Sequence, residues 1–188
     1  VRLGWSHGDD EIMSTENLIE WFDIDDINKA PARFDFKKLD DLNGHYVRGS
    51  GDASLLARIR DLLPHLDFAA LTSTPPDPKA PPRADAALAH EVGALLPEIA
   101  TGAALAERFE AAGWDKVESA LPAIKERAKT VADLVAQSLF LVANRPIRLD
   151  DKARKVMDAD AKAVLAALVP RLEAAETWTA ADLEALVR

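Results

Sequence analysis

The stretch KERAKTVADLV, residues 125–135, decides the fold class, because it holds the end of one helix and the start of another. Thr130 and Asp133 have the spacing of a capping box, in which each side chain accepts a hydrogen bond from the other residue's backbone. This spacing predicts that one helix ends near Lys129 and that the next begins directly after it. We expect the second helix to carry its apolar face on Leu134, Val135, Leu139 and Val142.

Apolar residues recur at helical spacing on both sides of this stretch, over residues 55–63, 88–99, 105–109 and 114–121. Pro122 is expected to open a helix at its first position, where a proline has no amide hydrogen to lose. The prolines within residues 72–82 predict a loop. Strand patterns are nearly absent, so we expect an all-α bundle or cage.

Two breaks in the helical pattern suggest domain boundaries. The first is the hinge-like segment GSG at residues 49–51, and the second lies near Pro146. They predict three parts, residues 1–48, 49–145 and 146–188. The sequence starts at Val1 rather than at a methionine and stops within a helical pattern, so we expect a piece of a longer protein.

The composition limits the class of protein. Of the 188 residues 48% are hydrophobic, enough to bury a core, and alanine and leucine dominate the second half. No apolar run is long enough to span a bilayer, there is no signal peptide, and there is no cysteine. These features favour a cytoplasmic protein. The net charge of −9 disfavours non-specific binding to polyanions, although local patches decide individual contacts.

The segment from His7 to Asp10 contains the residues that most suggest chemistry. His7, Asp9 and Asp10 are possible metal ligands, as in a metal-dependent or hydrolytic enzyme, but their spacing matches no established metal motif. We therefore interpret the segment as a solvated acidic loop. The sequence also lacks an EF-hand loop, a phosphate-binding glycine loop and a serine–histidine–acid arrangement.

Two groups of basic residues are candidates for phosphate contacts. The first group comprises Lys125, Arg127 and Lys129, directly before the capping box. The second comprises Arg145, Arg148, Lys152, Arg154 and Lys155, around a loop and the start of a helix. Lysine and arginine neutralise phosphates in nucleic-acid interfaces, but the same residues are also common on solvated helix faces. Composition alone favours the solvated face for both groups.

Several segments, in this order, resemble the bacterial glutamyl-tRNA synthetase family. They are residues 3–12 (LGWSHGDDEI), 18–22 (LIEWF), 28–35 (NKAPARFD), 42–46 (LNGHY) and, further on, 125–130 (KERAKT) and Trp178. The resemblance implies that residues 1–48 end a stem-contact domain, with Trp5, Trp21, Phe22, Phe34 and Tyr46 forming a small core. It implies that residues 49–145 form a first helical anticodon-binding subdomain and residues 146–188 the start of a second.

The family attaches glutamate to tRNA(Glu) with ATP and magnesium, through a glutamyl-adenylate. Its His-Ile-Gly-His type motif and its lysine–serine–lysine loop are absent from this sequence. The resemblance therefore implies a fragment without catalysis or cofactor, which binds tRNA(Glu) but neither DNA nor a membrane, from a monomeric cytoplasmic ligase. The alternative is a stand-alone helical module that binds a protein partner, which the acidic net charge favours.

The resemblance also ranks the basic residues as RNA contacts. Lys125, Arg127 and Lys129 come first, because they lie in the matching segment at residues 125–130. Arg48, Lys29 and Arg33 are expected to contact the tRNA stem. Arg145, Arg148 and Lys152 are further candidates.

Overall fold

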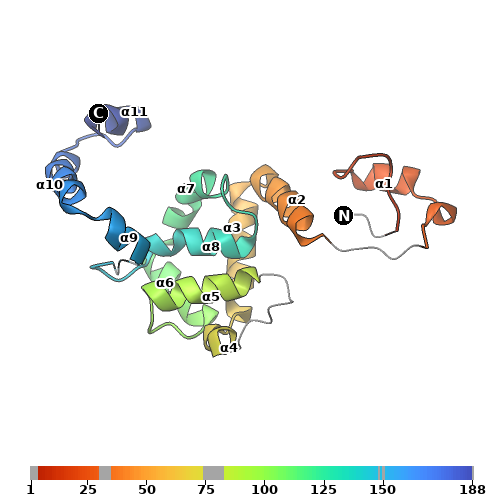
Figure 1. The fold of residues 1–188 in the computed structure, drawn as a ribbon, viewed down its shortest axis with the longest axis horizontal. Helices are drawn as coiled ribbons and strands as arrows, with labels where there is room; N and C mark the ends of the chain where they lie inside the picture. Colours follow the sequence, from red (N-terminus) through yellow and green to blue (C-terminus); the bar gives the residue numbers. More distant parts are fainter. Residues whose placement is uncertain (1–3, 30–34, 74–82, 148, 150, 188) are drawn as a thin grey trace. The chain divides into compact units, whose positions relative to one another are not determined.

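A computed structural model of the chain describes residues 4–29, 35–73, 83–147, 149 and 151–187. Contacts divide the chain into two compact units, Val1–Asn144 and Arg145–Arg188. In the described part, regular structure is helical apart from one antiparallel bridge between Asp67 and Thr101 (Figure 1). The predicted all-α fold is confirmed. None of the helices described is both long and apolar enough to cross a membrane.

The first unit contains α1 (Thr15–Trp21), α2 (Phe36–Gly49), α3 (Asp52–Leu62), α4 (Phe68–Ser73), α5 (Ala84–Leu95), α6 (Gly102–Ala112), α7 (Trp114–Ile124) and α8 (Val131–Ser138). Among the residues that the structure describes, the short 3-10 helices are η1 (Ile24–Asp26), η2 (Leu63–His65) and η3 (Leu139–Leu141). The second unit contains α9 (Asp151–Val156), α10 (Ala159–Glu173) and α11 (Ala180–Val187). The predicted three-part division of the chain into functional domains stays a prediction.

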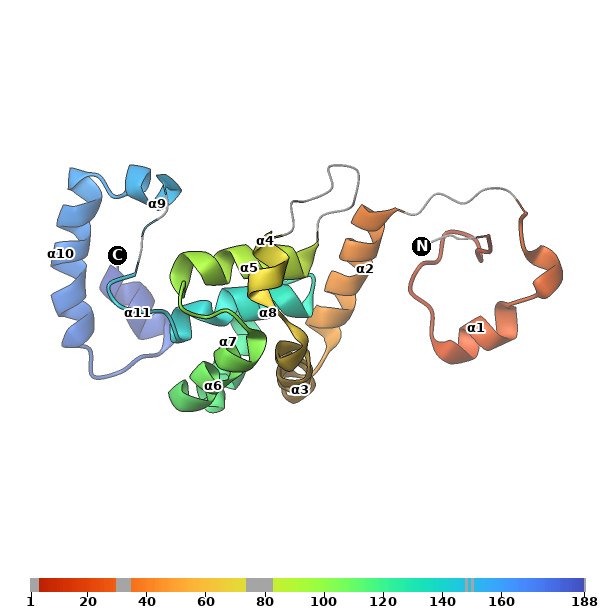
Figure 2. The same ribbon diagram turned by 90° about the horizontal axis from the view of Figure 1, so that it is seen from below.

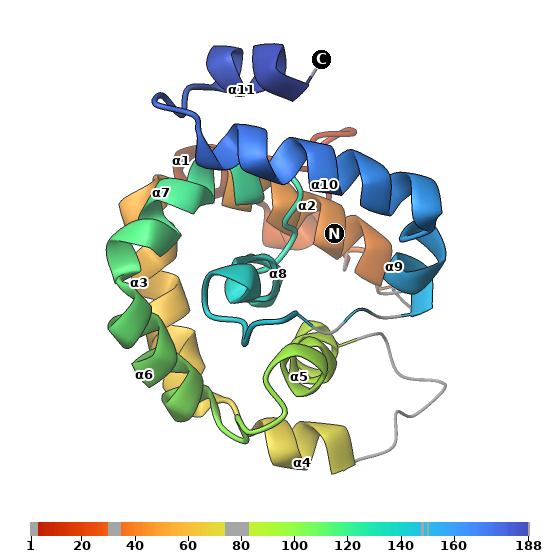
Figure 3. The same ribbon diagram turned by 90° about the vertical axis from the view of Figure 1, so that its left-hand side faces the viewer.

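The core of the first unit lies among α3, α5, α6, α7 and α8. Helix α5 runs beside α8, and α4 packs against α5 (Figures 1 and 3). Most of the apolar positions predicted from helical spacing between residues 55 and 142 become buried. They include Leu55, Ile59, Leu88, Val92, Leu105, Phe109, Val117, Leu121, Leu134, Val135 and Leu139. Burying them removes apolar surface from water, which is the main stabilising contribution to the bundle.

Pro122 shows how packing overrides a local preference. The prediction that it opens a helix is wrong, because it lies inside α7, near its last residue, Ile124. A proline within a helix removes one backbone hydrogen bond, and its ring crowds the carbonyl of the preceding turn. Leu121 and Ile124 on either side of it are buried, so their packing holds α7 through the proline.

The described aromatic residues before α3 form two partly exposed pairs and no buried core, so for them that prediction is wrong. Among the described residues before Gly44, none is buried. Trp5 meets Phe22 edge-on at 5.7 Å between ring centroids, and His7 stacks on Trp21 at 4.2 Å. Phe22 and Tyr46 are 50% and 53% exposed. Phe34, the remaining member of that predicted core, lies outside the described residues.

In the second unit, α10 and α11 contact each other along a helical hairpin (Figure 2). The Asp158 side chain caps α10 by accepting a hydrogen bond from the Ala161 amide at 2.8 Å. Thr179 Oγ1 accepts a hydrogen bond from the Asp182 amide at 3.2 Å, at the start of α11. The side chain of Trp178 is 65% exposed.

Candidate functional site

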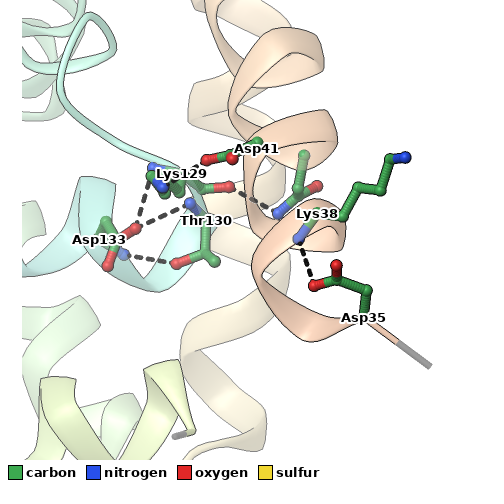
Figure 4. A network of polar contacts seen from close by, with 7 residues as sticks. Asp35, Lys38, Asp41, Lys129, Thr130 and Asp133 are labelled. Atoms are coloured by element: carbon green, nitrogen blue, oxygen red, sulfur yellow. Dashed lines mark hydrogen bonds and ion pairs between the residues drawn. The ribbon is translucent and has the colours of Figure 1, made fainter. Parts of the chain in front are cut away.

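The turn between α7 and α8, residues 125–130, contains the basic residues ranked first, and the predicted capping box fixes its geometry. Thr130 Oγ1 accepts a hydrogen bond from the Asp133 amide at 3.1 Å. Asp133 Oδ2 accepts hydrogen bonds from the amides of Thr130 and Lys129, both at 2.9 Å (Figure 4). Three backbone amides at the start of α8 are therefore paired with side-chain oxygens, so the turn has one defined conformation.

Lys129 connects this turn to α2. Its ammonium nitrogen lies 2.6 Å from Asp41 Oδ1, and its carbonyl oxygen accepts a hydrogen bond from Asn43 Nδ2 at 2.6 Å (Figure 4). The hydrogen bond from Lys129, together with its positive charge, holds the pKa of Asp41 below its ordinary value. The same pairing raises the pKa of Lys129. Both side chains remain about half exposed, so solvent screens the pair.

Gly44 allows α2 to approach the turn closely. A Cβ at this position would lie 3.4 Å from Cγ and 3.6 Å from Cα of Lys129, and 3.1 Å from a guanidinium nitrogen of Arg48. The buried residues of α2 are Gly44 and Val47. Leu39 and Tyr46, which are apolar residues at helical spacing on α2, are exposed. A glycine is what brings the backbone of α2 next to Lys129, and apolar periodicity gives no sign of such a contact.

Lys125, the first residue of the turn, contacts the junction between α2 and α3. Its ammonium group pairs with Asp52 Oδ1 at 2.7 Å and donates to the Ser50 carbonyl at 3.3 Å. The Lys125 side chain is only 17% exposed. Ser50 Oγ also donates to the Tyr46 carbonyl at 2.7 Å. The segment at residues 49–51, which the sequence suggests is a hinge, is therefore held by hydrogen bonds.

Arg127 and Arg48 are two further exposed cations of this region. Arg127 is exposed, and its side chain makes no hydrogen bond or ion pair with any described residue. Arg48 lies over Gly44, close enough to Lys129 for its charge to oppose the rise in the lysine's pKa. The structure therefore brings together four of the predicted residues around one turn, and two of them are already in ion pairs.

The remaining candidates lie elsewhere in the chain. Lys29 is exposed after η1, Arg145 is exposed at the start of the second unit, and Lys152 is exposed on α9. Arg33 and Arg148 lie outside the described residues. His7, proposed above as a possible metal ligand, stacks on Trp21. Within the part of the chain that the structure describes, no group of three or more His, Asp or Glu residues has the arrangement of a metal site.

Sequence reasoning missed a polar cluster at the end of the first unit. Arg108 on α6 donates from Nε to the Val142 carbonyl at 3.3 Å and also bonds the side-chain oxygen of Asn144. Asn144 in turn donates to Glu98 at 2.7 Å, and this hydrogen bond lowers the pKa of Glu98. The cluster joins segments that are 36 and 46 residues apart. No local sequence pattern marks it.

Comparisons with known proteins agree with the resemblance in the sequence. A family described as "Anticodon binding domain" matches residues 95–188. Glutamate--tRNA ligase 2 of Brucella ovis and that of Brucella canis are each 44% identical over 188 residues, which is 100% of this chain and 33% of the relative. Glutamate--tRNA ligase 1 of Brucella melitensis has the same identity and coverage. The chain spans about a third of the length of these curated relatives.

Proposed function

Because this chain belongs to the anticodon binding domain family, we propose that it binds tRNA, and that its partner is tRNA(Glu). The observation that carries the proposal is the 44% identity with glutamate--tRNA ligases over the whole 188 residues. The exposed arginines around the α7–α8 turn support it, because lysine and arginine bind nucleic acids chiefly through their phosphates. The chain's net charge of −9 limits binding to such local positions.

The proposed mechanism is positioning of an RNA substrate. Arg127 and Arg48 neutralise phosphates on the tRNA backbone, and side chains elsewhere in the chain read unstacked anticodon bases. Lys29, Arg33, Arg145, Arg148 and Lys152 are further proposed contacts. Lys125 and Lys129 already have carboxylate partners, Asp52 and Asp41.

For the whole protein we propose the activity in the names of these relatives, the ligation of glutamate to tRNA. Activation of glutamate with ATP and magnesium is assigned to segments of the protein outside these 188 residues. The chain itself is proposed to hold no catalytic residue and no cofactor. We also propose that the whole protein is a monomer and is located in the cytoplasm.

A filter-binding titration of the 188-residue chain with a tRNA(Glu) transcript, at several salt concentrations, tests this proposal. We expect binding that weakens steeply as salt rises, because cations released from phosphates drive such association. Replacing Arg127 with alanine should weaken binding roughly three- to tenfold. It should also make the slope of the logarithm of the binding constant against the logarithm of the salt concentration shallower by about 1, as for loss of one phosphate contact.

Lys116→Ala is the matched control, since Lys116 is exposed near the other end of α7. It should leave the affinity within about twofold of the wild type. Equal affinity for tRNA(Glu) and for an unrelated RNA hairpin of the same length would contradict the proposal. Equal affinities of wild type and Arg127→Ala would remove Arg127 from the interface.

A further inference from the structure

We propose that the α7–α8 turn is a clamp that holds helix α2 on the bundle, with Lys125 and Lys129 as positioning residues instead of phosphate ligands. The inference rests on the proposed function, because it assigns these lysines a part in presenting the exposed arginines to RNA. Arg127 is then the cation of the turn that remains available for a phosphate.

The backbone and the side chain of Lys129 both make polar contacts. Its amide donates to Asp133, its carbonyl accepts from Asn43, and its ammonium group pairs with Asp41 (Figure 4). Two of these three partners, Asn43 and Asp41, belong to α2. A lysine that contacts RNA has to direct its ammonium group at a phosphate, whereas Lys129 directs it at a carboxylate on α2.

Lys125 contacts the chain at the C-terminal end of α2. It bonds the Ser50 carbonyl, directly after α2, and the carboxylate of Asp52, the first residue of α3. With a side chain that is 17% exposed, Lys125 offers little of its ammonium group to an approaching phosphate. Its charge also lies next to the N-terminal end of α3, where the carboxylate of Asp52 balances it.

The two lysines hold α2 at two separate points. Asp41 and Ser50 are nine residues apart, which is about 13 Å along a helix. Attachment at one point leaves a helix free to pivot, but attachment at two points fixes its direction. Gly44 lies between them and allows α2 and Lys129 to come into contact, so backbone packing supports both ion pairs.

The direction of α2 matters for the proposed RNA surface. Arg48 lies in its last turn, and Lys38 in its first turns forms an ion pair with Glu11 in the segment before α1. Helix α2 therefore connects the N-terminal segment to the bundle. A clamp that fixes α2 sets the position of Arg48 relative to Arg127.

Charge reversal separates a clamp from a phosphate contact. Lys129→Glu places two carboxylates opposite each other, and the added change Asp41→Lys restores an ion pair with reversed polarity. Arg127→Glu is the matched control, because it makes the same charge change two residues away on the exposed side of the turn. Amide hydrogen exchange of residues 36–49, compared with α3 and α6, reports on the clamp, and binding of a tRNA(Glu) transcript reports on RNA.

We expect Lys129→Glu to speed exchange in α2 roughly tenfold, with α3 and α6 unchanged, because attraction becomes repulsion at an exposed pair. The Asp41→Lys/Lys129→Glu double variant should restore α2 exchange and tRNA affinity to within about twofold of the wild type. Arg127→Glu should weaken tRNA binding at least about tenfold while leaving α2 exchange unchanged.

Two results would overturn the clamp. Unchanged α2 exchange in Lys129→Glu would show that the pair does not hold the helix. Restored exchange with tRNA affinity still reduced in the double variant would show that Lys129 binds a phosphate directly. If the wild-type chain does not bind the transcript, the proposed tRNA binding is wrong, and so is the part of this inference that concerns RNA. The hydrogen-exchange measurements do not depend on RNA, so they still decide whether the two lysines hold α2.

Discussion

The ammonium nitrogen of Lys125 lies 2.7 Å from a carboxylate oxygen of Asp52, although 73 residues separate them in the sequence. Asp52 is the first residue of α3, so its negative charge also favours the positive N-terminal end of that helix. One carboxylate therefore stabilises both a helix start and a partly buried lysine. This contact joins the end of α7 to the start of α3.

Replacing Lys125 with methionine should lower the free energy of unfolding by about 1–2 kcal/mol, because two hydrogen bonds from a charged donor are lost while the apolar stem is kept. Urea denaturation measures the change. Lys116→Met, at an exposed position of α7, should change stability by less than about 0.5 kcal/mol. Equal midpoints for the wild type and Lys125→Met would show that the ion pair adds no stability.

Gly102 and Gly93 make a matched pair of helical glycines with opposite expectations. A Cβ on Gly102 would lie 1.8 Å from the Leu63 carbonyl oxygen, a backbone atom, whereas a Cβ on Gly93 meets nothing within 4 Å. Gly102→Ala should therefore destabilise the chain by about 3 kcal/mol, because α6 must move away from η2. Gly93→Ala should stabilise it by about 0.5–1 kcal/mol, since alanine favours helix more than glycine does.

Thermal unfolding of the two glycine variants, each compared with the wild type, checks this pair. The melting temperature should fall for Gly102→Ala and rise for Gly93→Ala. A neutral Gly102→Ala would mean that α6 and η2 do not pack as closely as the structure shows. Each variant serves as the control for the other, because both substitutions add the same methyl group to a helix.

The sequence predicts the local part of this architecture well. Helix α8 begins where Thr130 and Asp133 place it, and the apolar stripes of α3, α5 and α6 are buried as expected. Helical periodicity and capping depend on residues within a few positions of each other, so one sequence contains the full signal.

Contacts between distant segments account for what the sequence does not reveal. Lys129 was ranked as an RNA contact because it is a lysine in a matching motif, but its partner Asp41 is 88 residues away. The buried side of α2 depends on Gly44, which has no side chain to add to an apolar pattern. Which lysine is paired and which arginine is exposed follows only from the folded arrangement.

The capping box gives a further test of the α7–α8 turn. Thr130→Ala should destabilise the first unit by about 1 kcal/mol, because the Asp133 amide loses its side-chain partner. Thr130→Ser keeps the hydroxyl and should recover most of that loss. Urea denaturation of both variants measures the difference. A serine variant as unstable as the alanine variant would assign the effect to the threonine methyl group instead of the hydrogen bond.

The Asp41–Lys129 pair predicts a defined dependence of stability on pH. The pKa of Asp41 is held below its ordinary value of 3.8, so its stabilising contribution is fully present above 3.8 and is lost as pH falls through the lower, folded-state pKa. The pKa of Lys129 is raised above 10.5, so its contribution is present below 10.5 and is lost only as pH rises through the folded-state pKa. Both charges are therefore in place throughout the neutral range.

The stability difference between the wild type and Asp41→Asn should consequently be constant across neutral pH and shrink as the solution is acidified below 3.8. Urea midpoints of both proteins, measured over a series of pH values, give this difference, and subtraction cancels the titration of carboxylates that the two proteins share. Asp40→Asn is the control, because Asp40 adds only a minor charge effect at Lys129 and should give a much smaller difference. A difference that grows on acidification would mean that Asp41 is stabilised by its protonated form, contrary to a salt bridge with Lys129.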